Sequence, residues 1–205
     1  MSMRRAQSGI EVLDVAPLPS YRYGAHTLMW WGTMGLIAIE GTVFALAAFA
    51  YFYVRATTDV WPPGVPPPDL TWGTLNLIII LASIYPNQVT KKVAQREDLP
   101  AVRKWMAICL LPAVAFLIVR VFEYRSLNVG WDTNAYGSAV WMLLSLHTVH
   151  LVTDIYDTIV LLVLMHTGPL EGKRFVDVSE NAMYWYFVVI AWIPIYAIIY
   201  IVSRM

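Results

Sequence analysis

The sequence predicts an all-α membrane protein, a polytopic bundle of five transmembrane helices. Of its 205 residues, 59% are apolar and only 14% are charged, whereas soluble chains carry about 45–50% apolar and about 25% charged residues. The mean hydropathy is +0.58. Five separate apolar stretches reach the roughly 20 residues that a helix needs to cross about 30 Å of hydrocarbon. Together these observations exclude a single soluble domain.

We expect the five spans near residues 28–54, 70–89, 105–124, 138–165 and 182–203. The first and fourth are longer than the bilayer requires, which predicts tilt or extension beyond the hydrocarbon. Pro86 is expected to end the second span, because proline lacks a backbone donor and clashes with the preceding turn. The connector 57–69 holds five prolines, which favours a stiff, extended segment.

The organisation expected from these spans is simple. Residues 1–27 form an N-terminal tail and residues 28–205 form one five-helix transmembrane domain. The first 20 residues include Arg4, Arg5, Glu11 and Asp14. They lack the apolar core and small-residue cleavage site of a signal peptide, so we expect the tail to be retained.

Charge and cysteine content exclude several classes of function. The 14 basic and 14 acidic residues cancel, so the chain has no charge surplus of the kind that nucleic-acid binding requires. Cys109 is the single cysteine. Neither an internal disulfide nor a multi-thiolate metal site can therefore form within this chain.

Basic residues are distributed unequally between the two sides of the predicted bundle. One side carries ten: Arg4, Arg5, Arg22, Lys91, Lys92, Arg96, Arg103, Lys104, Lys173 and Arg174. The other carries four: Arg55, Arg120, Arg125 and Arg204. By the positive-inside rule, we expect a cytoplasmic N-terminus and a periplasmic C-terminus in a bacterial inner membrane.

Three carboxylates lie deep within predicted spans: Glu40, Asp154 and Asp157. A charge in hydrocarbon costs a few kcal/mol, so each of these groups needs a partner, water or a function. Glu40 has no cation near it in the sequence, which favours its neutral form. It is interpreted either as a protonated hydrogen-bond donor between helices or as a proton-linked site.

A polar stripe marks the fourth predicted span. His147, His150, Asp154 and Asp157 follow one another at spacings of 3, 4 and 3, which places all four on one helical face. Three interpretations remain open at this stage: a proton relay, half of a metal site, or a polar seam that holds helices together.

The metal interpretation finds little support in the ligand spacing. A di-iron bundle needs Glu-x-x-His pairs, but the residues three positions after Glu40, Glu123 and Glu180 are Val43, Ser126 and Met183. A haem with two axial histidines would need His26 or His166 to oppose the stripe. We therefore expect no metal and no catalytic residue in this chain.

The order of short motifs resembles subunit III of the haem–copper cytochrome c oxidases. Glu40 precedes Trp61-Pro62-Pro63 by about 20 residues, and Leu75-Asn76-Leu-Ile-Ile-Ile-Leu-Ala-Ser83 follows. Phe122-Glu123-Tyr124 resembles the family's Ser-Glu-Tyr-Tyr. Asp132-Thr-Asn-Ala-Tyr136-Gly137-Ser138 resembles Asp-Gly-x-Tyr-Gly-Ser, and Leu146-His147-Thr-Val-His150 resembles Phe-His-Gly-Leu-His. The last span resembles Trp-His-Phe-Val-Asp-Val-Val-Trp.

This resemblance implies a non-redox subunit of a respiratory oxidase. Family members pack against the catalytic subunit I, hold structural phospholipid and support proton uptake while the complex oxidises cytochrome c and reduces oxygen to water. Haem and copper are then expected in partner subunits, with subunit II as a further partner and cytochrome c as an indirect one. By position, Glu40 and Glu123 match two family glutamates, and His147 and His150 match the two family histidines.

The sequence also departs from the family pattern. It resembles only the last five of the usual seven helices, so another chain would have to complete the family's lipid-filled cleft. Tyr186 and Val189 stand where the final motif has His and Asp, and functions of those two residues do not carry over. Asp154 and Asp157 occupy positions where the family pattern is apolar or contains glycine.

Two alternatives stay open on the sequence. The altered final motif and the two aspartates are compatible with the related accessory protein of nitric oxide reductase systems. A small proton-coupled transporter would explain Glu40 and the polar stripe as a pathway. The sequence has no internal inverted repeat and no pair of broken spans, which are the features typical of such transporters.

Overall fold

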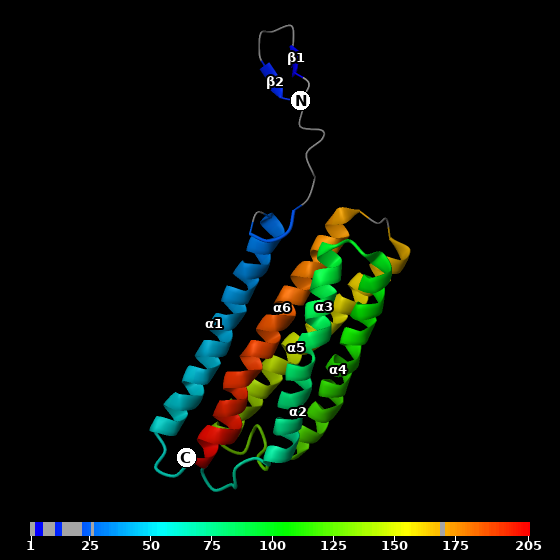
Figure 1. Ribbon diagram of the computed structural model, residues 1–205. Coiled ribbons are helices and arrows are strands. Elements are labelled where there is room, and N and C mark those ends of the chain that lie inside the picture. Colours follow the sequence, from blue (N-terminus) through cyan, green and yellow to red (C-terminus); the bar gives the residue numbers. More distant parts are fainter. Residues whose placement is uncertain (1–2, 6–10, 14–21, 26, 169–170) are drawn as a thin grey trace.

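The computed structural model is a bundle of long helices that lie side by side (Figure 1). It describes residues 3–5, 11–13, 22–25, 27–168 and 171–205. The helices are α1 Leu28–Ala56, α2 Leu70–Ala82, α3 Ile84–Gln95, α4 Leu99–Arg125, α5 Ala135–Thr167 and α6 Gly172–Tyr196. A π-helical segment Ala197–Ile201 and a 3-10 turn Val202–Arg204 continue α6. Two short strands, β1 Met3–Arg5 and β2 Glu11–Leu13, pair antiparallel with Met3 opposite Leu13.

The prediction of five membrane spans is confirmed. Within the described residues, five helical segments are long and apolar enough to cross a membrane: α1, α2 with α3, α4, α5, and α6 with its continuation to Arg204. The observed helices extend beyond the predicted limits at most ends. In α4, for example, the Asp98 side chain accepts a hydrogen bond from the Ala101 backbone N–H at 3.2 Å and starts the helix at Leu99. Hydropathy marks the apolar part of a helix, whereas capping decides where the helix begins.

The predicted end of the second span at Pro86 is wrong. The helix is interrupted earlier, at Ser83, and resumes as α3 from Ile84 to Gln95. Pro86 is the third residue of α3, in the first turn, where backbone N–H groups have no partner within the helix and a missing donor costs little. The Ser83 hydroxyl donates to the Ile80 carbonyl at 2.6 Å and accepts from the Trp185 indole N–H at 2.9 Å. The hydrogen bond from Trp185 connects the interrupted segment to α6.

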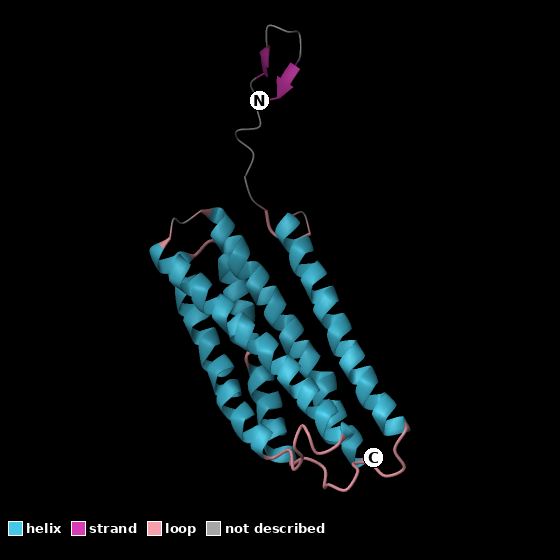
Figure 2. Ribbon diagram, turned by 180° about the vertical axis from the view of Figure 1, so that it is seen from behind, coloured by secondary structure: helices cyan, strands magenta, loops and turns pink. Residues whose placement is uncertain are grey.

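Helix α6 is the hub of the bundle. It packs against α1, α2, α3 and α5, while α4 packs against α2, α3 and α5. The same arrangement is visible from behind, where α1 lies at the side of the bundle (Figure 2). The core contains aromatic and branched side chains from the last three helices, including Phe116, Leu143, Val188 and Trp192.

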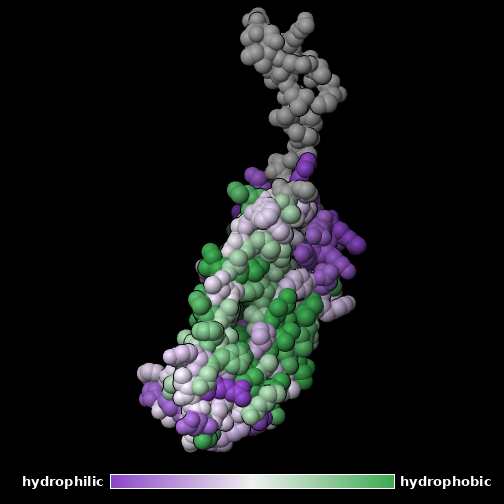
Figure 3. All heavy atoms as spheres, turned by 90° about the vertical axis from the view of Figure 1, so that its left-hand side faces the viewer, coloured by the Kyte–Doolittle hydropathy of each residue, from purple (hydrophilic) through white to green (hydrophobic). Residues whose placement is uncertain are grey.

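Helix α1 is the least enclosed of the five spans. Only 11% of its most apolar window is buried, and side chains such as Ile39, Leu46 and Phe49 are 64–70% exposed. The surface of the molecule is apolar along much of its length and more polar toward both ends (Figure 3). Such a surface suits hydrocarbon or a neighbouring membrane subunit rather than water.

The proline-rich connector between α1 and α2 is anchored by side chains. The Trp61 indole N–H donates to the Tyr51 hydroxyl at 3.1 Å, and the two rings meet edge to face. Asn134, which caps the start of α5, donates from its amide to the Pro63 carbonyl at 3.2 Å. These contacts tie the end of α1 to the start of α5.

The start of α5 leaves no room for a side chain at Gly137. A Cβ atom there would lie 2.2 Å from the backbone oxygen of Gly130, and a backbone atom cannot rotate away. We expect Gly137→Ala to lower the free energy of unfolding by about 1–3 kcal/mol, the usual cost of overpacking. Thermal unfolding in detergent measures this loss. Gly35→Ala is the matched control, because nothing lies within 4 Å of its Cβ position; equal effects of the two changes would contradict the packing argument.

Candidate functional site

A buried ion pair lies near one end of the bundle core. Arg120 and Glu123 are one turn apart on α4, with Nη1 2.9 Å from Oε2 and side-chain exposures of 1% and 0%. The Asn76 amide donates to Oε2 at 2.5 Å, and the Tyr200 hydroxyl donates to Oε1. The carboxylate of Glu123 thus receives donors from α2, from α4 and from the continuation of α6. We call Asn76, Arg120, Glu123, His147 and Tyr200 the inner polar cluster.

The guanidinium of Arg120 lies between aromatic rings. Its Cζ atom is 4.0 Å from the ring centroid of Trp192 and 4.6 Å from that of Phe116. A ring face attracts a cation, and the attraction grows when water is excluded. The positive charge is therefore compensated by Glu123 and by two ring faces at once.

The contacts of His147 determine its tautomer. Nδ1 lies 3.2 Å from Nη2 of Arg120, and Nε2 lies 3.0 Å from the carbonyl oxygen of Val188. A guanidinium can only donate and a carbonyl can only accept. Nδ1 must then accept and Nε2 must carry the hydrogen, so the ring is neutral. His147 positions Arg120 and has no free nitrogen for a metal.

The burial of Arg120 changes the count of basic residues from which the orientation was predicted. The sequence interpretation placed it among the four basic residues on the periplasmic side, whereas the structure buries it within the bundle. A positive charge inside the protein contributes nothing to the loop charge that the positive-inside rule counts. The spacing of three residues to Glu123 was the available signal, because such pairs face each other on a helix.

A second polar cluster joins α1 to α5 and α6. The Tyr184 hydroxyl donates to Oε2 of Glu40 at 2.5 Å, and Nε2 of His150 lies 3.6 Å from Oε1 of the same carboxylate. The side chains of Glu40 and His150 are 20% and 11% exposed. We call Glu40, His150 and Tyr184 the outer polar cluster. The sequence offered no cation near Glu40, but the fold supplies His150 from a distant helix.

The two ring nitrogens of His150 have different neighbours. Nδ1 lies 2.6 Å from the Leu146 carbonyl oxygen, so Nδ1 must be the donor in that hydrogen bond. Nε2 faces Oε1 of Glu40 across 3.6 Å.

The two aspartates of the polar stripe share one partner. The Asn181 amide donates to Oδ2 of Asp157 at 3.0 Å and to Oδ1 of Asp154 at 3.4 Å, and it accepts from the Thr158 hydroxyl. Asp154 is buried and Asp157 is exposed. The stripe therefore contacts three helices: His147 contacts α4 and α6, His150 contacts α1, and both aspartates contact Asn181 of α6.

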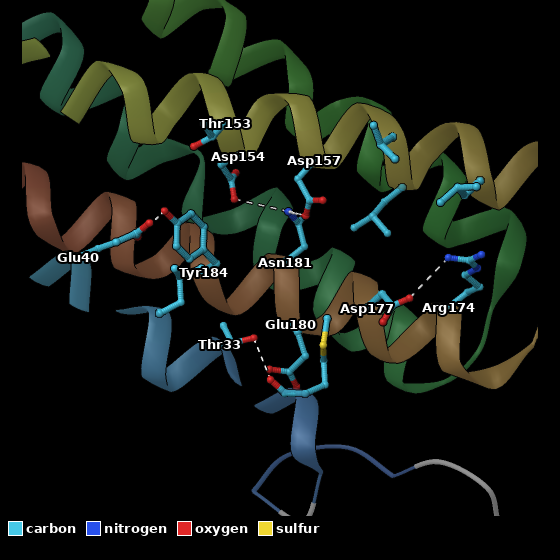
Figure 4. A pocket seen from close by; sticks show the side chains of 15 residues that line it. Thr33, Glu40, Thr153, Asp154, Asp157, Arg174, Asp177, Glu180, Asn181 and Tyr184 are labelled. Atoms are coloured by element: carbon cyan, nitrogen blue, oxygen red, sulfur yellow. Dashed lines mark hydrogen bonds and ion pairs between the residues drawn. The ribbon is translucent and has the colours of Figure 1, made fainter. Parts of the chain in front are cut away.

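A groove opens beside the outer polar cluster, between α1 on one side and α5 and α6 on the other (Figure 4). Its volume is about 620 Å³. We call it the acidic groove, after the five carboxylates among its lining residues: Glu40, Asp154, Asp157, Asp177 and Glu180. Arg174 is its single basic lining residue.

Several of these polar residues were missed at the level of sequence. Neither Asn76, Asn181 nor Tyr200 belongs to a polar pattern in the sequence, and only packing brings each of them to a carboxylate. Glu180 and Tyr184 did carry a signal, because polar residues four positions apart lie on one face of a helix.

The described residues include no group of three His, Cys, Asp or Glu side chains that could hold a metal ion. His166, one of the two candidates to oppose the stripe, lies near the end of α5 with Nδ1 2.8 Å from the Leu162 carbonyl. His26, the other candidate, lies outside the described residues.

The fold and these clusters define a class: a multi-pass helical membrane protein with polar groups paired between its helices. Comparison with known proteins gives the family. The family described as Cytochrome c oxidase subunit III matches residues 22–204. The chain belongs to the cytochrome c oxidase subunit III family.

Individual relatives agree with this assignment. The chain is 25% identical over 176 residues to cytochrome c oxidase subunit 3 of Thermostichus vulcanus, covering 84% of this chain and 87% of the relative. It is 29% identical over 180 residues to the probable cytochrome c oxidase subunit 3 of Mycobacterium tuberculosis, covering 83% and 86%. A heme-copper oxidase subunit I+III of Aeropyrum pernix is 27% identical over 187 residues, which are 86% of this chain and 22% of that protein.

The inner polar cluster predicts a strong effect of removing its cation. Arg120→Met leaves Glu123 buried without a counter-charge, and we expect the free energy of unfolding to fall by about 3–5 kcal/mol. The double change Arg120→Met with Glu123→Gln removes both charges, and it should recover much of that loss. Thermal unfolding of the single and double variants in detergent measures the difference. A double variant no more stable than Arg120→Met would show that packing, not charge, decides the effect.

Proposed function

We propose that this chain is the non-redox subunit III of a respiratory haem–copper cytochrome c oxidase, where it stabilises the catalytic subunit and supports proton uptake during reduction of oxygen to water. Membership of the family implies association with other oxidase subunits. The fused relative, whose name joins subunits I and III, supports subunit I as the direct neighbour. Subunit II, cytochrome c through the complex, and membrane lipids are the further proposed partners.

The observation that carries the proton role is the outer polar cluster. In a membrane span, an imidazole nitrogen lies 3.6 Å from a carboxylate oxygen, and the Tyr184 hydroxyl donates to the same carboxylate. Imidazole and carboxyl side chains are the groups that most often accept and donate protons in proteins. The cluster borders the acidic groove, so protons have a polar surface from which to reach it.

The stabilising role rests on different residues. The inner polar cluster locks α2, α4, α5 and the end of α6 together, which makes the bundle a rigid unit. The side chains of α1 also form an exposed apolar surface along one side of the bundle. A rigid unit with such a face can brace a larger membrane subunit, and haem and copper would be held by that partner.

The topology proposed from the sequence accompanies this function. The N-terminal tail of residues 1–27 would be cytoplasmic, the domain 28–205 would span a bacterial inner membrane, and the C-terminus would be periplasmic.

Purification through a tag on Met205 tests the assembly. Haem–copper subunits with cytochrome c oxidase activity should co-purify; a nitric oxide reductase instead, or a chain recovered alone, would overturn the proposal.

Glu40→Gln tests the proton role directly. The amide keeps the size and hydrogen bonding of the side chain but cannot ionise, so assembly should be unchanged. We expect the purified oxidase to lose activity several-fold sooner during continuous turnover, because proton delivery falls behind oxygen reduction. The number of turnovers before inactivation is the measurement. Glu171→Gln, an exposed glutamate at the start of α6, is the control, and equal lifetimes for both variants would exclude a proton role for Glu40.

A further inference from the structure

The acidic groove holds more carboxyl groups than the chain pairs with basic side chains. Glu40 is paired with His150 and Tyr184. Asp177 has Arg174, with Nη1 3.8 Å from Oδ2. Asp154 and Asp157 share only the neutral amide of Asn181.

Glu180 is the carboxyl group of the groove whose hydrogen bonds are least satisfied. Its side chain lines the groove but is only 4% exposed to solvent, and Oε2 has no hydrogen-bond partner. Lys91 of α3 attracts this carboxylate from a distance. The Lys91 ammonium lies over the Tyr186 ring, 5.8 Å from its centroid, and is not part of the groove lining.

Three carboxylates on two facing helices therefore lack a cation within the groove. Burial of an unpaired charge is costly, and a partner that removes the cost stabilises the protein. The described carboxylates do not converge into a group that could hold a metal ion. A cation that pairs with these carboxylates must therefore come from another molecule and enter the groove.

We propose that the acidic groove binds the ammonium group of a lysine from a neighbouring membrane segment. An ammonium is a compact charge with three donors on a flexible stem, whereas a guanidinium is a rigid fork suited to one carboxylate. The ammonium would contact Glu180 of α6, whose Oε2 has no hydrogen-bond partner, or Asp157 of α5, which lines the same groove. Apolar lining residues such as Met29, Leu36 and Leu164 match the four-carbon stem of the lysine.

Charge balance favours a lysine over a lipid headgroup. A zwitterionic lipid would bring a phosphate with its amine and would add no net positive charge to the groove. Arg174, the single basic lining residue, is already paired with Asp177, so it is not available for that phosphate. A lysine side chain adds one full positive charge and nothing else.

This inference rests on the proposed association with other oxidase subunits, because the lysine must come from a partner within that complex. A zero-length cross-link tests it in the intact, purified complex. A membrane-permeant carbodiimide activates a carboxyl group, and a lysine amine in contact with it then forms an amide. Peptide mass spectrometry should find Glu180 or Asp157 joined to a lysine of a co-purified membrane subunit, and Glu180→Gln should reduce that product.

A charge reversal provides the second measurement. Glu180→Lys places an ammonium in the groove from within and repels the incoming one. We expect the variant chain that accumulates to retain about tenfold less of its partner, since about 1.4 kcal/mol corresponds to each tenfold change. Glu171→Lys makes the same change on the same helix outside the groove and should retain the partner fully. Asp157→Lys serves if Glu180→Lys does not accumulate, because Asp157 is exposed.

The outcomes separate this inference from the proposed function. An intact oxidase complex without the cross-link, or one in which Glu180→Lys stays fully bound, would overturn the lysine alone. An amine lipid coupled to Glu180 would overturn it in favour of a headgroup. A preparation that contains no oxidase subunit would overturn both.

Discussion

The contact on which the bundle depends is the buried ion pair between Arg120 and Glu123. Two charges taken out of water cost several kcal/mol each, and only good geometry with further hydrogen bonds repays that cost. Here Asn76 and Tyr200 supply the hydrogen bonds to the carboxylate. These donors come from different helices, so the ion pair is stable only when the helices are packed in this one arrangement. A polar cluster of this kind specifies the arrangement of apolar helices that lipid alone would not distinguish.

The two polar clusters differ in how their histidines are held. In the inner polar cluster, His147 has a fixed tautomer and both of its ring nitrogens are engaged, although Oδ1 of Asn76 and Nε of Arg120 are buried without a hydrogen-bond partner. In the outer polar cluster, Nδ1 of His150 contacts the Leu146 carbonyl and Nε2 faces Glu40 across 3.6 Å. The proposed proton role therefore falls on the outer polar cluster, which borders the acidic groove.

The carboxylates of the acidic groove are paired unequally. Glu40 is paired, Asp154 and Asp157 share a neutral amide, and Glu180 has an oxygen without a partner. Charge compensation is therefore incomplete along this groove. Because unpaired charge is expensive in a membrane, this groove is the part of the molecule most dependent on what lies beside it. An assembly partner is a natural source of the missing charge.

The sequence by itself determined the class and the five spans, because hydropathy depends on local composition, and the cost of charge in lipid singled out Glu40 as a candidate. It could not determine where the second span ends, since Pro86 is harmless in the first turn of α3 and the interruption at Ser83 depends on a bond from Trp185. Nor could it determine the partners of the polar stripe. Residues evenly spaced on one helical face meet different neighbours, because α5 contacts α1, α4 and α6 at different places along its length. Only the tertiary structure placed Arg120 against His147 and Trp192 and brought His150 to Glu40, since these contacts join residues that are distant in the chain.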